Sequence, residues 1–342
     1  MINKREVEQM ITIKDVAAYA NVSKSTVSRV LSGNGYVGEA TKKQVMQAVQ
    51  DLGYKPNTIA KSLKVRRSGT IGVIIPSIQN LIFPDIVRGI EDTARKAGLT
   101  VILCNSDEDI EVEQAYIEKL CSMWIDGFIV SSMTKKSNHI KTLRQKGVPV
   151  VLTGRICDKG IDAVIIDNVQ AAYDATAYLI RTGRRKIAII LGRSSITLYK
   201  ERFQGYKKAL EDYQIPFDER LVFTENAKNN NIYGEVKNFL EKEIALDAIF
   251  ATTDEKAIVC MRAIRDMGYD IPNDIAVMGF DNVNLSSMLE PPLSTVSQPL
   301  YEMGDLAVKR LIEVIHYKNQ EGCLPKPDIH ILDVDLLVRK ST

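Results

Sequence analysis

Short amphipathic patterns occupy the first 52 residues of the chain. Apolar side chains recur there three or four residues apart, in three separate groups. The groups are Ile13, Val16, Ala17 and Ala20; Val27, Val30 and Leu31; and Val45, Ala48, Val49 and Leu52. A stripe with this spacing is the buried face of an amphipathic helix. The pattern therefore predicts three short helices around one small core, the second over residues 24–32 and the third over residues 39–52.

Polar residues at the ends of these stripes support the prediction. Thr12 precedes the first stripe and Asp15 follows three residues later, an arrangement that caps a helix. Asn21 follows the stripe, and asparagine tolerates a left-handed backbone better than most residues other than glycine. Ser23 can cap the second helix. Two short helices joined by a tight turn, with a third closing the core, form a helix-turn-helix module, which we assign to residues 11–56.

The pattern changes after residue 69. Continuous apolar runs alternate with amphipathic stretches such as 83–97 and 202–213, an order typical of parallel βα units. The predicted strands are Ile71–Ile75, Thr100–Cys104, Gly127–Ser131, Val148–Thr153, Val164–Ile166, Lys186–Leu191, Ala248–Ala251, Ile275–Gly279 and Asp333–Val338. Two successive sets of strands, split near residue 165, indicate an α/β body built from two doubly wound parallel-sheet lobes.

The C-terminal segments define the limits of the two lobes. A late helix over residues 300–317 is expected to return to the first lobe and the final strand to the second, so that three segments cross between the lobes and form a hinge. The body comprises residues 69–342. Its predicted first lobe consists of residues 69–165 and 294–324, and its second lobe of residues 166–293 and 325–342.

Composition excludes several classes of protein. The chain has 342 residues, 45% of them hydrophobic, which is enough for packed cores. Its apolar runs are too short to span a bilayer and its charged N-terminus shows no secretory signal, so we expect a cytoplasmic protein. The five cysteines and three histidines have no metal or redox spacing. We expect no metal, no cofactor and no enzyme activity, since no GxSxG elbow or well-placed histidine is present.

Charge is distributed unevenly along the chain. Residues 1–68 hold 12 Lys and Arg against 5 Asp and Glu, whereas the whole chain has a net charge of only +2. A basic head on a mildly acidic body indicates an anionic polymer as partner, although solvated charges can also cluster by chance. Burial of Val27 and Val30 turns Lys24, Ser25 and Arg29 outward together with Ser28. Such a face suits either the major groove of DNA or a solvated helix surface.

The run TIKDVAAYANVSKSTVSRVLSGNGYVGEATKKQVMQAVQDLGYKPNTIAKSL resembles the DNA-binding headpiece of the LacI/GalR repressor family over almost its whole length. Asn21 stands where many members carry glycine. Met10 stands where members usually begin, so residues 1–10 are expected to be an extension, of which residues 1–9 are untranslated or disordered. The resemblance implies a periplasmic-binding-protein-like body and the following DNA-binding residues: Thr12, Ser23, Lys24, Ser25, Thr26, Ser28, Arg29, Tyr54, Asn57, Ala60, Leu63 and Lys64.

Residues 57–68 are expected to form a hinge helix and linker. Pro56 stops the third helix, and the two turns that follow are too short to be stable alone. Leu63 is an apolar side chain in a basic, polar stretch. It resembles the hinge leucine of the family, a wedge that enters a minor-groove base step and kinks the duplex. The alternative is that Leu63 packs on the body.

Polar side chains follow most of the predicted strands, at the edge where ligands of open α/β sheets bind. Ser, Asn, Asp, Arg and Thr dominate there, and these side chains either hydrogen-bond hydroxyl groups or cap helices. The family resemblance selects six effector-binding residues: Phe83, Arg155, Asp167, Arg202, Thr253 and Asp281. Arg202 and Asp281 suit a polyol. They can instead form an internal ion pair, and Arg155 with Arg202 would suit a sugar phosphate.

These observations together predict a repressor of carbohydrate-utilisation genes. It would bind double-stranded, pseudo-palindromic operator DNA as a homodimer and respond to a small sugar or sugar phosphate between its lobes. The stretch DNVNLSSMLEPPLSTVSQPLYEMG is also similar to catabolite control proteins, which leaves a phosphorylated carrier protein open as corepressor. A cytosolic solute-binding sensor without a DNA role is the alternative from another class.

Overall fold

The computed structural model describes residues 11–32, 35–54, 68–131, 138–155, 160–194, 196–225, 231–241 and 246–342. It separates into two compact units, residues 1–68 and 69–342. Within the described ranges, no helix is both long and apolar enough to cross a membrane.

The N-terminal unit is a three-helix module. Helix α1 (Ile13–Tyr19), α2 (Lys24–Ser32) and α3 (Glu39–Asp51) pack on one another. Their core consists of Val16, Ala17, Ala20, Val27, Val45 and Ala48, all of which are buried. These are positions of the predicted stripes, so the sequence-based helices and core are confirmed. The buried core side chains are all valine or alanine. These side chains are small enough to let three helices of no more than 13 residues pack closely together.

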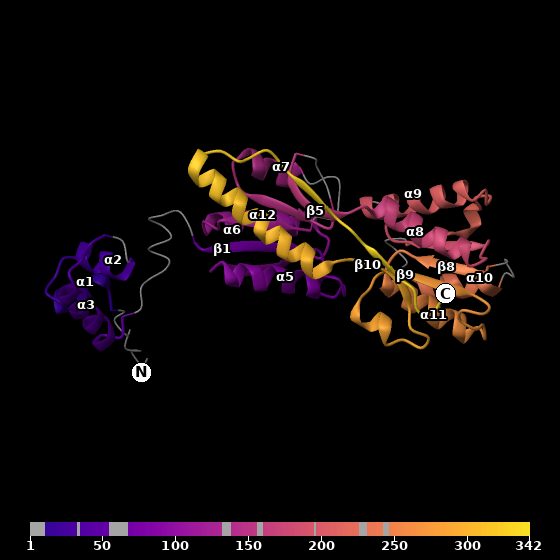
Figure 1. The fold of residues 1–342 in the computed structure, drawn as a ribbon, viewed down its shortest axis with the longest axis horizontal. Coiled ribbons are helices and arrows are strands. Elements are labelled where there is room, and N and C mark those ends of the chain that lie inside the picture. Colours follow the sequence, from indigo (N-terminus) through magenta and orange to yellow (C-terminus); the bar gives the residue numbers. More distant parts are fainter. Residues whose placement is uncertain are drawn as a thin grey trace, which may run out of the picture. The chain divides into compact units, whose positions relative to one another are not determined.

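The first lobe of the second unit is a parallel sheet between two helical layers. Its strand order is β11-β5-β4-β3-β1-β2, with all neighbours parallel. The strands are β1 (Thr70–Ile75), β2 (Thr100–Asn105), β3 (Gly127–Val130), β4 (Val150–Thr153), β5 (Asp162–Ile166) and β11 (Ile329–Leu332). Helices α5 (Phe83–Lys96) and α12 (Leu300–Glu321) pack together beside the sheet (Figure 1). Helices α6 (Ile110–Ser122) and α7 (Asn138–Gln145) contribute to a separate core cluster of this lobe.

The second lobe repeats this architecture. Its strand order is β12-β10-β9-β8-β6-β7, and β12 pairs antiparallel with β10. The strands are β6 (Ile187–Leu191), β7 (Val222–Thr224), β8 (Ala248–Ala251), β9 (Ala276–Asp281), β10 (Ser294–Ser297) and β12 (Asp335–Leu337). Helices α8 (Asn168–Arg181) and α9 (Thr197–Asp212) pack as one pair, and α10 (Ile232–Glu241) and α11 (Asp254–Asp266) as another (Figure 1). Two 3₁₀ turns, Glu219–Leu221 and Asn284–Ser287, complete the lobe.

Two of the sequence-based lobe limits are corrected by strand pairing. Residues 294–297 form β10, which pairs with β9 and therefore belongs to the second lobe, not the first. Residues 329–332 form β11, which pairs with β5 in the first lobe, not the second. The chain thus crosses between the lobes just after β5, after β10 and after β11. Neither strand was predicted from the sequence, because each is only four residues long and the partner of β11, strand β5, lies far earlier in the chain.

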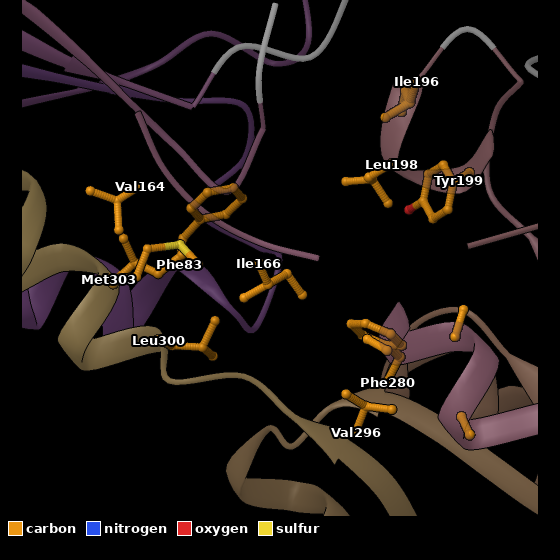
Figure 2. Packing of buried hydrophobic residues seen from close by; sticks show 14 of the residues in the cluster. Phe83, Val164, Ile166, Ile196, Leu198, Tyr199, Phe280, Val296, Leu300 and Met303 are labelled. Atoms are coloured by element: carbon orange, nitrogen blue, oxygen red, sulfur yellow. The ribbon is translucent and has the colours of Figure 1, made fainter. Parts of the chain in front are cut away.

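The hydrophobic core continues from one lobe to the other. One cluster includes Phe83, Ile166 and Met303 of the first lobe together with Leu198 and Phe280 of the second. Figure 2 shows these side chains at close range, on elements of both lobes. Further clusters fill the far side of each sheet. Because apolar side chains of both lobes belong to one cluster, apolar packing partly sets the arrangement of the lobes. This packing does not depend on which polar ligand is bound.

Candidate functional site

The turn between α1 and α2 has the geometry that a helix-turn-helix requires. Asn21 adopts a left-handed backbone with φ of 44°, as its position after the first stripe predicts. The amide of Val22 donates to the carbonyl of Ala17, which closes the end of α1. The hydroxyl of Ser23 accepts from the amide of Thr26 at 3.1 Å and so caps α2. The cap at Thr12 is also confirmed, since its amide and hydroxyl both donate to Asp15 at 2.7 Å.

One face of α2 is buried and the opposite face is exposed. Val27 is fully buried, whereas Lys24, Ser25, Ser28 and Arg29 are exposed. A basic and hydroxyl-bearing helix face of this kind can place Arg on guanine edges and hydroxyls on phosphate oxygens. The packing of Val27 holds this face outward, so the orientation of the four polar side chains follows from the core.

The remaining predicted DNA-binding residues lie at the ends of helices or outside the described residues. Ser23 hydrogen-bonds Ser25 at 2.7 Å and Thr26 at 2.8 Å through their hydroxyls, which pre-arranges the first turn of α2. Thr12 precedes α1, and Tyr54 follows α3 and packs against the headpiece core. Asn57, Ala60, Leu63 and Lys64 fall within residues 55–67, outside the part of the chain that the structure describes.

Arg202 lies deep between α9 and the second sheet. Its Nε donates to the side-chain oxygen of Asn168 at 3.0 Å, and Nη1 donates to the carbonyl of Thr252. The guanidinium carbon lies 3.5 Å from the ring centroid of Phe280. Nη1 is 3.8 Å from Asp281 Oδ1, and the side chain is only 4% exposed. Burial lowers the pKa of Arg202, while the Asp281 carboxylate opposes that shift. The two side chains that the sequence offered as an alternative internal pair therefore lie close together.

Asp281 ends β9 and is buried as deeply as Arg202. Burial raises the pKa of its carboxyl to about 8, and Arg202 opposes the shift. Gln298 donates to Oδ1 at 2.6 Å. The residue has φ of 131°, a conformation that side chains other than glycine rarely adopt. The strained backbone places the carboxyl inward, where it contacts Arg202 rather than bulk water.

The structure does not bring all the predicted effector residues to one surface. Phe83 is 1% exposed and belongs to the apolar cluster between the lobes. Asp167 is exposed and caps α8, since it accepts from the amide of Gln170 at 2.9 Å. Burial lowers the pKa of Arg155 to about 10. Thr253 caps α11 and also lines the cavity between the lobes.

That cavity has a volume of about 490 Å³, within the range of small-molecule sites. The first lobe contributes Asn80, Asp107 and Glu108 to its lining. The second lobe contributes Arg193, Tyr199, Glu225, Thr253, Glu255 and Lys256. Most of these residues follow the carboxyl ends of β2, β6, β7 and β8 directly, where the sequence predicts ligand-binding side chains. Tyr199 lies on α9 one turn before Arg202 and was not predicted.

Two hydrogen bonds join the lobes across this cavity. Arg193 donates to Glu108 at 2.6 Å, and the amide of Leu81 donates to Glu255 at 3.1 Å. On the second lobe, the ammonium of Lys256 lies 3.1 Å from Glu225 and 5.4 Å from the ring centroid of Tyr199. In the described part of the chain, His, Cys, Asp and Glu side chains form no cluster that could hold a metal ion. The cavity is a polar site between the two lobes, lined by charged and hydroxyl-bearing side chains.

Comparison with known proteins covers both units. Residues 12–57 match the family of bacterial regulatory proteins of the lacI type, and residues 68–327 match the family of periplasmic binding proteins and the sugar binding domain of the LacI family. The HTH-type transcriptional regulator RegA of Clostridium acetobutylicum is 40% identical over 335 residues, covering 96% of this chain and 98% of that protein. The ribose operon repressor of Halalkalibacterium halodurans is 37% identical, with 90% and 92% covered.

A solved structure shows the same architecture in full. The lac repressor dimer bound to operator and the anti-inducer ONPF is similar with a TM-score of 0.86 and 26% identity. The match covers 97% of this chain and 99% of that chain. The expected combination of a helix-turn-helix unit with a two-lobed body is therefore shared along almost the whole length of a known protein.

Proposed function

The chain belongs to the lacI family of bacterial regulatory proteins, and we propose on that basis that it represses carbohydrate-utilisation genes by binding operator DNA as a homodimer. It is a DNA-binding transcriptional regulator with a sugar-binding effector domain. A solute-binding sensor without a DNA role does not account for the match of residues 12–57. Because its relatives are regulators, we propose that it acts in the cytoplasm and without catalysis.

The observation that carries the proposal is the exposed face of α2. Lys24, Ser25 and Arg29 project from a helix whose other side is locked into the headpiece core by Val27. In a homodimer, two such helices read the two halves of a pseudo-palindromic operator. Arg29 is proposed to contact a base edge, while Ser23, Thr26 and Tyr54 position the unit on phosphates.

The hinge completes the proposed DNA contact. The paired segments 57–68 of two subunits would meet at the dyad, with Leu63 inserted into a minor-groove step. A short helix of this kind folds only when DNA and partner are present. An effector between the lobes then changes operator affinity by favouring one spacing of the two hinges.

The cavity between the lobes supports a small-molecule effector. Thr253, Tyr199 and Asn80 line it, and their hydroxyl and amide groups suit a sugar. The ribose operon repressor among the relatives supports the same class. The cavity and this relative support a small-molecule effector rather than a phosphorylated carrier protein as corepressor.

Duplex binding at several salt concentrations tests the proposed function. The full-length protein is titrated into labelled genomic fragments between about 50 and about 200 mM salt. We expect affinity to fall by orders of magnitude over this range, through counterion release, while one fragment keeps an advantage of about a thousandfold or more over bulk DNA. Equal affinity for all fragments at every salt concentration contradicts the proposal.

A further inference from the structure

One edge of the first sheet is the place where the chain enters the body. Gly69, the first residue of the body, directly precedes β1, and its amide donates to the carboxylate of Asp126 at 3.0 Å. The amide of Asp126, just before β3, donates to the carbonyl of Thr70 at 2.8 Å. Because neighbouring strands of this sheet are parallel, the amino ends of all its strands share this edge, which we call the tethered edge.

Basic side chains prevail in the helix-to-strand connections that reach the tethered edge. Counted from the last four residues of each helix to the first residue of the next strand, these connections are residues 93–100, 119–127, 142–150 and 318–329. They hold seven Lys and Arg but only three Asp and Glu. The sequence that leads into this edge from the DNA-binding unit is basic as well, with Lys61, Lys64, Arg66 and Arg67.

The equivalent edge of the second lobe has the opposite balance of charge. Helix C-termini attract cations in general, so this lobe shows whether that effect accounts for a basic edge. Its helix-to-strand connections are residues 178–187, 209–222, 238–248 and 263–276. Apart from residues 242–245, which lie outside the described ranges, they hold six Lys and Arg but nine Asp and Glu. Of the two equivalent edges, the basic one is therefore the edge that carries the linker.

Two arginines near the tethered edge are bound within the protein. Asp162, at the start of β5, is fully buried and accepts from Arg144 at 2.6 Å and from Arg310 at 2.8 Å. The same two guanidinium groups also donate to the carbonyls of Pro325 and Lys326, at 2.6 and 3.3 Å. These arginines are thus engaged, and they fix the backbone from which the Lys326 side chain extends.

Lys119, Lys146 and Lys326 remain available to a partner. All three side chains are exposed, and within the described ranges none of them is in an ion pair, whereas Arg95 donates to Asp92 at 2.8 Å. The connections that carry them lead into β3, β4 and β11, which span three strand spacings, or about 14 Å. A duplex carries one phosphate charge per roughly 1.7 Å of axis, so several phosphates fall within this span.

We propose that the tethered edge of the body contacts phosphates of duplex DNA through Lys119, Lys146 and Lys326. This inference rests on the proposed operator binding by the helix-turn-helix unit. Residues 55–68 can span at most about 50 Å, so the edge stays near a duplex on which that unit is bound. A tether of this length gives an effective concentration of roughly millimolar, at which weak phosphate contacts add to affinity. Such contacts read no bases and strengthen binding to every sequence alike.

The salt dependence of duplex binding tests this contact on the full-length protein. The edge variant combines Lys119→Gln, Lys146→Gln and Lys326→Gln. The control variant neutralises three exposed lysines of the second lobe, by Lys186→Gln, Lys207→Gln and Lys208→Gln. Each phosphate contact adds about 0.9 to the slope of log affinity against log salt, and a homodimer has two copies of the edge.

We expect the slope of the edge variant to be smaller by about 2 or more, and its affinity at about 100 mM salt to be about tenfold or more lower. The loss should be the same on random duplex and on the preferred genomic fragment. The control variant should keep the slope of wild type. So should a variant with arginine at the three edge positions, because it keeps their charge.

The outcomes distinguish this contact from the proposed function. A wild-type slope in the edge variant overturns the contact, while the preference of wild type for one fragment over bulk DNA tests the proposed function on the same samples. A loss restricted to the preferred fragment also overturns it, because phosphate contacts do not select sequence. Equal losses of slope in the edge and control variants overturn it too, since they indicate an effect of net charge alone.

Discussion

Glu108 and Arg193 belong to different lobes, and their side chains meet at 2.6 Å across the cavity. Glu108 and the preceding Asp107 both adopt left-handed backbones, with φ of 62° and 51°. Two consecutive residues of this kind cost roughly 1–2 kcal/mol each. The turn after β2 is therefore held in a costly conformation that directs a carboxylate to the opposite lobe, and the ion pair is well placed to influence how the lobes are arranged.

Arg193→Gln is expected to let the lobes move apart. The pair is partly exposed, so its loss should change the free energy of unfolding by only about 1 kcal/mol or less. The radius of gyration from X-ray scattering should increase. Glu108→Gln should give the same change, and the double variant no further change, because both substitutions break one contact. Arg220→Gln, which breaks a local pair within the second lobe, is the control, and additive effects of the two interlobe substitutions would contradict the idea.

Arg29→Ala is expected to weaken operator binding more than binding to bulk DNA. Loss of one base contact costs about 1–3 kcal/mol of discrimination, whereas loss of a phosphate contact weakens all sequences alike. Fluorescence anisotropy with operator and with random duplex measures both affinities. Lys43→Ala, an exposed cation on α3, serves as the control. Parallel losses on both duplexes would assign Arg29 to the phosphate backbone instead.

Leu63→Ala is expected to lower operator affinity by about tenfold or more, since the wedge that holds a kinked base step is lost. Binding of effector to the body should barely change, because the residue belongs to the proposed hinge segment. The two affinities are measured by anisotropy and calorimetry on the same preparation. Unchanged operator affinity would reject the wedge. A loss of effector binding would favour the alternative that Leu63 packs on the body.

Gly304→Ala is expected to destabilise the body. A Cβ at this position of α12 would lie 2.1 Å from the carbonyl oxygen of Ile86 on α5, so the two helices must separate. Overpacking of this kind costs about 1–3 kcal/mol, despite the better helix propensity of alanine. Urea unfolding measures the change. Lys309→Ala removes an exposed i,i+4 ion pair on the same helix and should cost much less. Equal effects of the two substitutions would contradict this close approach.

The sequence predicted local structure well because local structure depends on neighbours in the chain. The caps at Thr12 and Ser23 and the left-handed Asn21 involve groups within five residues of one another. Strands β10 and β11 were not predicted, and their residues were placed in the wrong lobes, because the tertiary fold determines the pairing with β9 and β5.

The candidate effector site was predicted only in part for a related reason. The sequence shows which polar side chains follow the strands, and Thr253 does line the cavity. It does not show which of them are already bound by the protein. Arg202 is held by Asn168 and Thr252, and Asp167 caps a helix. For Arg202, hydrogen bonds to residues far away in sequence decide whether the side chain remains available to a ligand.

The buried carboxyl of Asp281 should make stability depend on pH. Burial raises its pKa to about 8 from an ordinary value of 3.8, so between these values the folded chain holds a proton that the unfolded chain has lost. The free energy of unfolding therefore falls as pH rises through this window. Asp281→Asn removes the titrating group and keeps an oxygen that can accept from Gln298.

Urea unfolding of wild type and Asp281→Asn at pH of about 5, about 6.5 and about 8 measures this contribution. The stability of the variant relative to wild type should improve steadily as pH rises, because only wild type must ionise a buried carboxyl. Asp218→Asn is the control: Arg220 lowers the pKa of Asp218 to about 2, so its contribution is complete above the ordinary carboxyl range and adds no slope between these pH values. If Asp281→Asn shows the same pH dependence as wild type, the buried carboxyl is ionised throughout and the Arg202 ion pair outweighs the cost of burial.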